Sequence, residues 1–300
     1  MTARLISHRF ALSIVLAGVL LLISCSSDRD ETSEAMVSVG TYRLHMRRQG
    51  GGSPAVIIDT GLGDRAENWA PIQERIASKT TVCVYDRAGY GQSEPGSFPR
   101  DSGRIARELK DLLEGAQIPG PYVLVGHSIG GLNMQVFAGE FRDDVAGVVL
   151  LDPPPLSWIR GECYQGLHSM ADEMTARWRD EADAYSESTD PGERSRAAFL
   201  RTLASEHEEV FNTSSALAGR IATFGDIPLI VIGSGRPNPM FGELAEEYQK
   251  YWVEQSRLLA EKSENGRFVL AEGSSHNLYA DEPELVVQSI LSVVSEVRDE

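Results

Sequence analysis

Basic residues and cysteines are both scarce in this chain. Its 300 residues include 28 lysines and arginines against 44 aspartates and glutamates, a formal net charge of −16 at pH 7. Nucleic-acid-binding proteins carry a basic stripe, so this balance argues against a nucleic-acid partner. Three cysteines are too few for a disulfide framework, and we expect Cys83 and Cys163 to be free thiols. The length suits one α/β domain with an insertion, and no internal repeat interrupts it.

The N-terminus lacks an apolar run long enough to span a membrane. Its uncharged run, 10–23, has 14 residues, whereas a membrane helix needs roughly 20. Basic residues precede this run, as in a signal peptide. The run ends Leu22-Ile23-Ser24-Cys25, which resembles the bacterial lipoprotein signal; an ordinary secretory signal is the alternative. The resemblance implies that 1–24 is removed, that Cys25 carries lipid, and that the protein is exported and lipid-anchored at a membrane surface of the cell envelope. The residues that follow are polar and acidic, so we expect 25–35 to be a flexible tether.

Short apolar runs alternate with helical periodicity along the rest of the chain. Strands are expected at 55–58, 80–85, 121–125, 145–151, 228–232 and 268–271, after a hairpin at 37–47. Helices are expected at 69–77, 101–113, 131–142 and from Pro283 onward. Strands that alternate with helices predict parallel βαβ units covered on both faces. The predicted fold class is therefore α/β, with a mostly parallel, doubly wound sheet.

The alternation stops for about 70 residues after Asp152. Apolar side chains at helical spacing occupy this interval, in one set at Leu167, Met170, Met174 and Trp178 and another at Phe199, Leu203, Val210 and Phe211. We predict a helical cap at 154–224, inserted into a core formed by 36–153 and 225–300.

A serine lies where one predicted strand meets a helix. Gly126-His127-Ser128-Ile129-Gly130 is a G-x-S-x-G pattern with the strand before it and the helix after it, the context of a nucleophile elbow. A serine hydroxyl is a poor nucleophile unless it is exposed and beside a base. The sharp turn would lift Ser128 above the sheet edge, and its crowded backbone explains Gly126 and Gly130.

A histidine late in the chain is the candidate base. His276 follows the last predicted strand, and the carboxyl ends of parallel strands open onto one edge of the sheet. Its loop can therefore reach Ser128, take the hydroxyl proton and return it to the leaving group. His127 is adjacent to Ser128 in sequence, but we expect it to point elsewhere.

These segments together resemble the α/β-hydrolase superfamily, in its form with a helical cap. The matching stretches are 59–63, 85–93, 122–131, 148–152 and 273–283. The resemblance implies an α/β-hydrolase-type sheet with an inserted cap, and an oxyanion hole formed by the backbone N–H groups of Leu62 and Ile129. Such donors stabilise the negative oxygen of a tetrahedral intermediate. Asp86 and Arg87 are expected to hold the loop beneath the site.

The chain departs from the family pattern at the position of the acid that supports the histidine. The family usually places an aspartate shortly after the strand that matches 229–232, but 233–243 contains none. Some relatives carry the acid after the preceding strand, and that position is Asp152. A carboxylate there could accept the histidine N–H and stabilise the imidazolium. We favour Asp152; Glu243, another acid or no acid are the alternatives.

The resulting hypothesis is a serine esterase that acts through an acyl-enzyme on a small or medium acyl substrate, since an apolar cap suits an acyl group. Amide, peptide or lactone hydrolysis by the same residues stays open, as does a surface-anchored binding protein that has lost its acid. A dehalogenase is disfavoured because its elbow would carry aspartate. No metal or cofactor is expected, since the sequence has no His/Cys cluster with ligand spacing.

Overall fold

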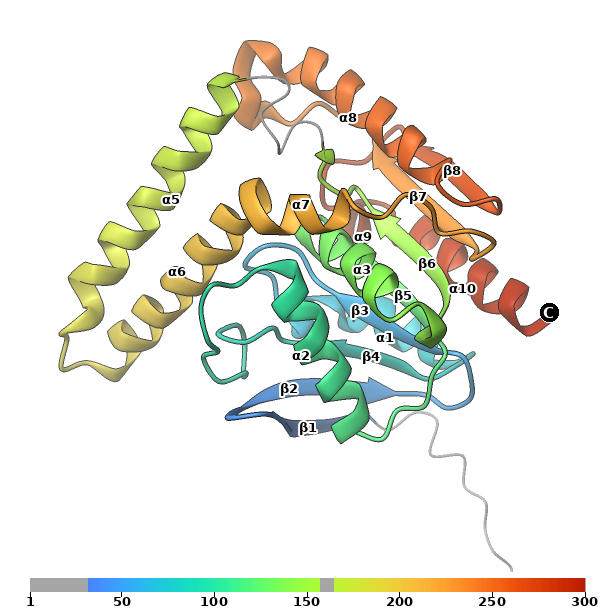
Figure 1. Cartoon of the computed structure of the whole chain (residues 1–300), viewed down its shortest axis with the longest axis horizontal. Coiled ribbons are helices and arrows are strands. Elements are labelled where there is room, and N and C mark those ends of the chain that lie inside the picture. Colours follow the sequence, from blue (N-terminus) through green and yellow to red (C-terminus); the bar gives the residue numbers. More distant parts are fainter. Residues whose placement is uncertain (1–31, 157–164, 300) are drawn as a thin grey trace, which may run out of the picture.

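The computed structural model of the protein describes residues 32–156 and 165–299 (Figure 1). The predicted signal peptide, the lipid site at Cys25 and the thiol of Cys163 lie outside the described residues. No helix within the described ranges is long and apolar enough to cross a membrane.

The strands of the described residues form one eight-stranded sheet, in the order β1-β2-β4-β3-β5-β6-β7-β8. They are β1 (Ser33–Val39), β2 (Tyr42–Gln49), β3 (Ala55–Asp59), β4 (Val82–Tyr85), β5 (Tyr122–His127), β6 (Val145–Leu151), β7 (Leu229–Ser234) and β8 (Gly266–Ala271). β2 pairs antiparallel with β1 and β4, and the remaining pairs are parallel. The predicted mostly parallel α/β sheet is confirmed. β1 begins before the predicted hairpin because its first residue, Ser33, still pairs with Arg48 of β2.

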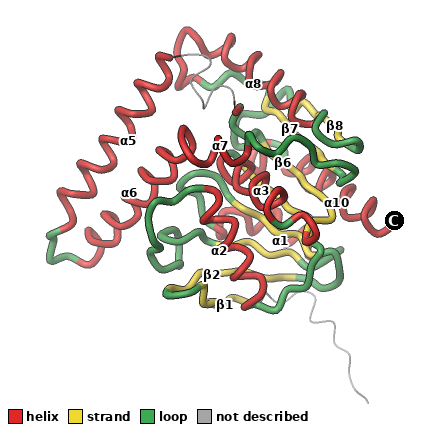
Figure 2. The backbone as a smooth tube through the Cα atoms, viewed as in Figure 1, coloured by secondary structure: helices red, strands yellow, loops and turns green. Residues whose placement is uncertain are grey.

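Helices follow most of the parallel strands (Figure 2). They are α1 (Ala70–Ala77), α2 (Ser102–Gly115), α3 (Ile129–Glu140), α5 (Gln165–Ser186), α6 (Pro191–Glu209), α7 (Ser215–Ala218), α8 (Ala245–Ala260), α9 (Leu278–Asp281) and α10 (Pro283–Asp299). Asp101 begins α2 by accepting the Arg104 N–H at 3.0 Å, as N-cap aspartates do. Helix α8 was not predicted, and it contributes to the site.

The central strand β5 explains why the sheet has two apolar cores. Tyr122 and Leu124 belong to the core beneath α2, α3 and α8, whereas Val123 and Val125 belong to the core beneath α1 and α10. Successive side chains of a strand point to opposite faces, and here both faces are covered. All six residues of β5 are therefore buried, and the strand is held rigidly up to the turn that follows it.

Helices α5 and α6 form a hairpin that extends beyond the sheet (Figure 1). They pack mainly against each other, with a small apolar cluster at Ala182, Ala197, Leu200 and Leu203 that also includes Tyr90 of the core. After α6 a π-helical turn, Val210–Ser214, and α7 lead the chain back to α3. No strand lies between β6 and β7 within the described residues.

Candidate active site

Ser128 lies in a strained turn between β5 and α3. Its φ of 52° and ψ of −123° are values that residues other than glycine rarely adopt. The Ser128 N–H donates to the Leu151 carbonyl at 2.9 Å, and its own carbonyl accepts from Gly131 at 2.8 Å. A Cβ on Gly126 would lie 2.5 Å from the Gly130 carbonyl oxygen, so the turn excludes a side chain there. The elbow predicted from the sequence is present with the crowding that it requires.

Asp152 and His276 are joined by a short hydrogen bond. His276 Nδ1 lies 2.6 Å from Asp152 Oδ2, and Asp152 is only 3% exposed. An ionised carboxylate can only accept, so Nδ1 carries the proton and Nε2 is left as an acceptor. Asp152, like Ser128, follows a parallel strand with a positive φ, here 47°. The other candidate acid, Glu243, is exposed in the 3₁₀ turn Pro239–Leu244 and is not among the described residues around the cavity.

Ser234, the last residue of β7, holds Asp152 from the neighbouring strand. Its N–H donates to Asp152 Oδ1 at 2.8 Å, and its hydroxyl donates to Oδ2 at 2.9 Å. Gln249 of α8 donates to the Ser234 carbonyl at 2.6 Å. In the family pattern the acid follows this strand, β7. Here the end of β7 instead supplies two donors to Asp152, which follows the neighbouring strand β6. Neither Ser234 nor Gln249 was anticipated from the sequence.

A cavity of about 310 Å³ lies between this sheet edge and the cap. Ser128, Asp152 and His276 line it together with Leu62 and Ile129. Further lining residues come from the cap, from the loop after β7 and from α8; they include Met174, His207, Val210, Phe211, Phe241, Tyr248 and Trp252. The predicted site residues of the core thus meet at one largely apolar cavity.

The two predicted oxyanion donors lie on either side of the elbow. Ile129 is the first residue of α3, where N–H groups have no acceptor within the helix. Leu62 belongs to the loop after β3, which passes close to the elbow. A Cβ on the preceding residue, Gly61, would lie 2.9 Å from His127 Nδ1 and 3.7 Å from Ser128 Cβ. A side chain at position 61 would therefore crowd the His127 ring beside the elbow.

His127 has a partner other than Ser128. Its Nε2 lies 2.8 Å from the His276 carbonyl oxygen, so Nε2 carries the proton and donates. Burial lowers the pKa of His127 to about 4, and the neighbouring His276 acts in the same direction. The ring is therefore neutral near pH 7, and it fixes the backbone of the loop that presents His276.

The same loop is held from its other side by Asp281. This carboxylate accepts from the Ser275 N–H at 2.7 Å and from the Ser275 hydroxyl at 2.6 Å. It also pairs with Arg236 at 2.8 Å. The Ser275 hydroxyl and N–H lower the pKa of Asp281, with a smaller effect from Arg236. His276 is thus placed by contacts on both sides rather than by a free loop.

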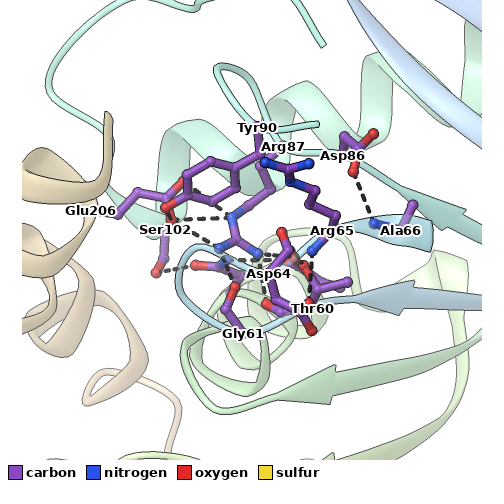
Figure 3. Close-up of polar contacts among 12 residues, drawn as sticks. Thr60, Gly61, Asp64, Arg65, Ala66, Asp86, Arg87, Tyr90, Ser102 and Glu206 are labelled. Atoms are coloured by element: carbon purple, nitrogen blue, oxygen red, sulfur yellow. Dashed lines mark hydrogen bonds and ion pairs between the residues drawn. The ribbon is translucent and has the colours of Figure 1, made fainter. Parts of the chain in front are cut away.

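A buried ion cluster lies beneath the loop that carries Leu62 (Figure 3). The Arg87 guanidinium donates to Asp59 Oδ1 at 2.5 Å, to the Thr60 carbonyl at 2.6 Å and to the Gly61 carbonyl at 2.9 Å. Its other partner is Glu206 of α6. The expectation that Arg87 holds this loop is confirmed. Glu206 was not anticipated, because a glutamate in a charged helix ordinarily faces solvent.

No group of three or more His, Cys, Asp or Glu side chains among the described residues could hold a metal ion. Cys83 is a buried free thiol, as expected, and burial raises its pKa to about 12. A thiol with so high a pKa is a poor nucleophile at neutral pH.

The chain is similar in sequence to known proteins along most of its length. The chain is 28% identical over 246 residues to the uncharacterized protein YqjL of Bacillus subtilis (strain 168), covering 82% of this chain and 85% of that protein. It is 24% identical over 316 residues to an AB hydrolase superfamily protein of Gibberella zeae, covering 92% and 96%.

Solved structures share the fold. A thermophilic esterase from Thermogutta terrifontis superposes with a TM-score of 0.62 at 20% identity, covering 89% of this chain and 99% of that one. A serine hydrolase involved in carbazole degradation, CarC, gives a TM-score of 0.59 at 17% identity over 88% and 99%. The family model described as "Alpha/beta hydrolase family" matches residues 55–289. The chain belongs to the alpha/beta hydrolase family.

Proposed function

We propose that this hydrolase cleaves carboxylic esters through an acyl-enzyme, with Ser128 as nucleophile, His276 as base and Asp152 as acid. The observation that carries the proposal is the 2.6 Å bond between His276 and Asp152, on the wall of the cavity that Ser128 also lines. That bond leaves His276 Nε2 as the ring atom able to accept the Ser128 proton.

In the first half-reaction, Ser128 Oγ bonds to the ester carbonyl carbon while His276 Nε2 takes the hydroxyl proton. The carbonyl oxygen becomes an anion that faces the N–H groups of Leu62 and Ile129. Losing one such donor costs about 10²–10³ in rate. When the tetrahedral intermediate collapses, the C–O bond to the alcohol breaks. His276 then gives its proton to the departing alkoxide, and the acyl group remains on Ser128.

In the second half-reaction, water replaces the alcohol. His276 takes one proton from the water as the water oxygen bonds to the acyl carbon. Collapse of the new intermediate breaks the bond to Ser128 Oγ, which recovers the proton from His276, and the carboxylic acid leaves. Asp152 stabilises the imidazolium in both halves and keeps the ring in the productive tautomer.

The cavity favours a small or medium acyl group. Its volume of about 310 Å³ lies at the lower end of the roughly 300–1,000 Å³ range of small-molecule sites. Met174, Phe211 and Phe241 give it apolar walls. The esterase and serine hydrolase that share this fold add support by analogy. The same residues could cleave an amide or a lactone, so the leaving group is a question for kinetics.

A fluorophosphonate probe tests the proposal. We expect stoichiometric labelling of the wild-type protein and none of Ser128→Ala, with turnover of short-chain p-nitrophenyl esters lost in parallel. Lactones and aminoacyl amides assayed beside the esters rank the three leaving groups. A folded wild-type protein that takes up no probe and turns over none of these substrates would favour the binding-protein alternative instead.

We also propose that the protein is anchored by lipid on Cys25, on the strength of the sequence pattern that ends there. Mass spectrometry of the mature protein should find modified Cys25 at its N-terminus. An unmodified N-terminus at another residue would reject the anchor without bearing on the hydrolase proposal.

A further inference from the structure

Glu206 brings a buried charge from the cap into the core. Its carboxylate accepts from Arg87 Nε at 3.1 Å and from Arg87 Nη2 at 2.9 Å, and the Tyr90 hydroxyl donates to it at 2.8 Å. The Glu206 and Arg87 side chains are both 0% exposed. Arg87 is a residue of the core and Glu206 belongs to α6, so the contact joins two parts of the fold (Figure 3).

Every N–H group of the Arg87 guanidinium donates a hydrogen bond. Nη1 donates to Asp59 and to the Thr60 carbonyl, Nη2 donates to the Gly61 carbonyl and to Glu206, and Nε donates to Glu206. These contacts use all five donors of an arginine. Although burial opposes its charge, Glu206 and Asp59 hold the pKa of Arg87 well above its ordinary value. The position of the guanidinium therefore depends on both carboxylates.

One of these contacts sets the direction of a peptide group in the site. The Gly61–Leu62 bond is not among the cis peptides of the described residues, so it is trans. In a planar trans peptide the C=O and the following N–H point in opposite directions. Because the Gly61 carbonyl accepts from Arg87 in the buried cluster, the Leu62 N–H points away from the cluster. Leu62 is one of the residues that line the cavity.

We infer that Glu206 is a positioning residue for the oxyanion hole, acting through Arg87 on the Leu62 N–H. The inference rests on the ester hydrolysis proposed above and adds a part for the cap. By holding the guanidinium from the cap side, Glu206 keeps the Gly61 carbonyl turned inward and the Leu62 donor turned toward the developing oxyanion. The cap thus contributes to the rate as well as to the walls of the cavity.

The chain contains a matched control for this contact. Glu108 of α2 accepts from both terminal nitrogens of Arg100, at 2.5 and 2.7 Å, and also accepts the Tyr42 hydroxyl. It is 7% exposed, so it too is a buried glutamate that holds one arginine and one tyrosine. None of the hydrogen bonds of this second cluster reaches the Leu62 loop within the described residues.

The test compares Glu206→Gln with Glu108→Gln in the full chain. Glutamine keeps the shape and one acceptor but removes the charge. For each variant we would measure kcat and KM on a short-chain ester, the inhibition constant of an alkyl boronic acid, and the thermal midpoint. The boronic acid forms a tetrahedral adduct with a serine and places an oxygen in the oxyanion hole. It therefore reports on the hole independently of the leaving group.

For Glu206→Gln we expect a loss of about tenfold in kcat and a similar loss in boronate affinity, a fraction of what deleting a donor costs. Its KM should change by less than about threefold, because the ground state uses the donor less. Glu108→Gln should lose thermal stability to a similar extent while it keeps both kinetic values. Wild-type kcat and boronate affinity in Glu206→Gln, or equal losses in both variants, would overturn the inference.

Two other outcomes of this experiment can also be interpreted. If Glu206→Gln does not fold, Tyr90→Phe removes one donor from the same carboxylate, and unchanged kcat and boronate affinity there would overturn the inference as well. If the wild-type protein neither turns over the ester nor binds the boronate, the proposed function has failed. That outcome is distinct from a working enzyme in which Glu206→Gln has no effect.

Discussion

The carboxyl edge of the sheet and the helical cap use their polar groups in different ways. At the edge, Ser128 and Asp152 both adopt a positive φ directly after a parallel strand, and their side chains line one cavity. In the cap, α5 and α6 contact chiefly each other, and the buried carboxylate of Glu206 is directed to Arg87 rather than to the cavity. The edge brings together the side chains proposed to react. Within the described residues, the cap supplies apolar side chains to the cavity and the Glu206–Arg87 ion pair to the core.

The difference follows from what each region can hold in place. A residue other than glycine at such backbone angles costs about 1–3 kcal/mol and persists only where the surroundings over-determine it. β5 and β6 are buried on both faces of the sheet, which meets that condition. The α5–α6 hairpin has only a small apolar cluster of its own. The strained backbone of Ser128 and Asp152 therefore lies at the strand ends, where the buried sheet holds it in place.

The largest expected effect would come from removing the base at the edge. His276→Gln should lower kcat by about 10³–10⁴ without unfolding the protein, because general-base catalysis is lost. His45→Gln is the matched control, since His45 Nδ1 bonds Asp86 at 2.9 Å in a second buried His–Asp pair away from the cavity. Ester kinetics and circular dichroism of both variants make the comparison. Similar losses of kcat in the two would mean that the edge is not the reacting site.

The second effect is on stability and involves one histidine in each region, His127, which is buried, and His207, which is partly buried. Burial lowers the pKa of His127 at the edge and of His207 in the cap to about 4. An unfolded histidine binds its proton near pH 6.5, so the unfolded state gains protons first as the pH falls. The free energy of unfolding should therefore drop between about pH 6.5 and 4, by about 2 kcal/mol per histidine from pH 7 to 5.

Urea unfolding at the two pH values measures this drop. His127→Gln and His207→Gln should each reduce the pH dependence by a similar amount. If only His127→Gln does so, His207 is not buried in solution and the cap is looser than the edge.

A smaller effect is expected from the support of the acid. Ser234→Ala removes the hydroxyl donor to Asp152 but keeps the backbone donor. A hydrogen bond to a charged group contributes about 1.5–3 kcal/mol, and we expect about a tenfold loss in kcat because part of that contribution orients Asp152. KM should stay within about twofold. An unchanged kcat would show that the strand pairing alone orients Asp152.

The smallest effect should come from the cap wall. Met174→Ala removes apolar surface from the cavity, and each lost methylene contact is worth about 0.8 kcal/mol, or about fourfold. We expect KM for an octanoyl ester to rise by about fivefold, while the kinetics on an acetyl ester are unchanged. An equal change in KM for the two esters would place Met174 away from the acyl chain.

Features whose signal lies within a short stretch of the chain could be predicted from the sequence. The alternation of apolar runs and helical patterns predicted the parallel sheet, and the elbow motif placed Ser128 between a strand and a helix. Parallel strands share one open edge, so the position of His276 after the last strand was informative. In each case the signal lies within a few residues along the chain.

The missed features depend on pairs that only the folded chain brings together. Nothing near Glu206 in the sequence shows that Arg87 lies opposite, 119 positions away. Ser234 likewise has meaning only because β6 and β7 are neighbours in the sheet. Helix α8 did leave a signal, since Ala245, Tyr248 and Trp252 recur at helical spacing. That spacing predicts the helix, but it does not show that Gln249 of this helix contacts Ser234 at the end of β7.

The proposed function depends most on Asp152, which would complete a catalytic triad with Ser128 and His276. The most direct measurement is the rate of covalent labelling by a fluorophosphonate in wild type, Asp152→Asn and Glu243→Gln, with the adduct located by peptide mass spectrometry. We predict labelling at Ser128, slowed by about 10³–10⁴ in Asp152→Asn because asparagine favours the wrong tautomer of His276, and unchanged in Glu243→Gln. Wild-type labelling of Asp152→Asn, or a loss confined to Glu243→Gln, would mean that Asp152 is not the acid that supports His276.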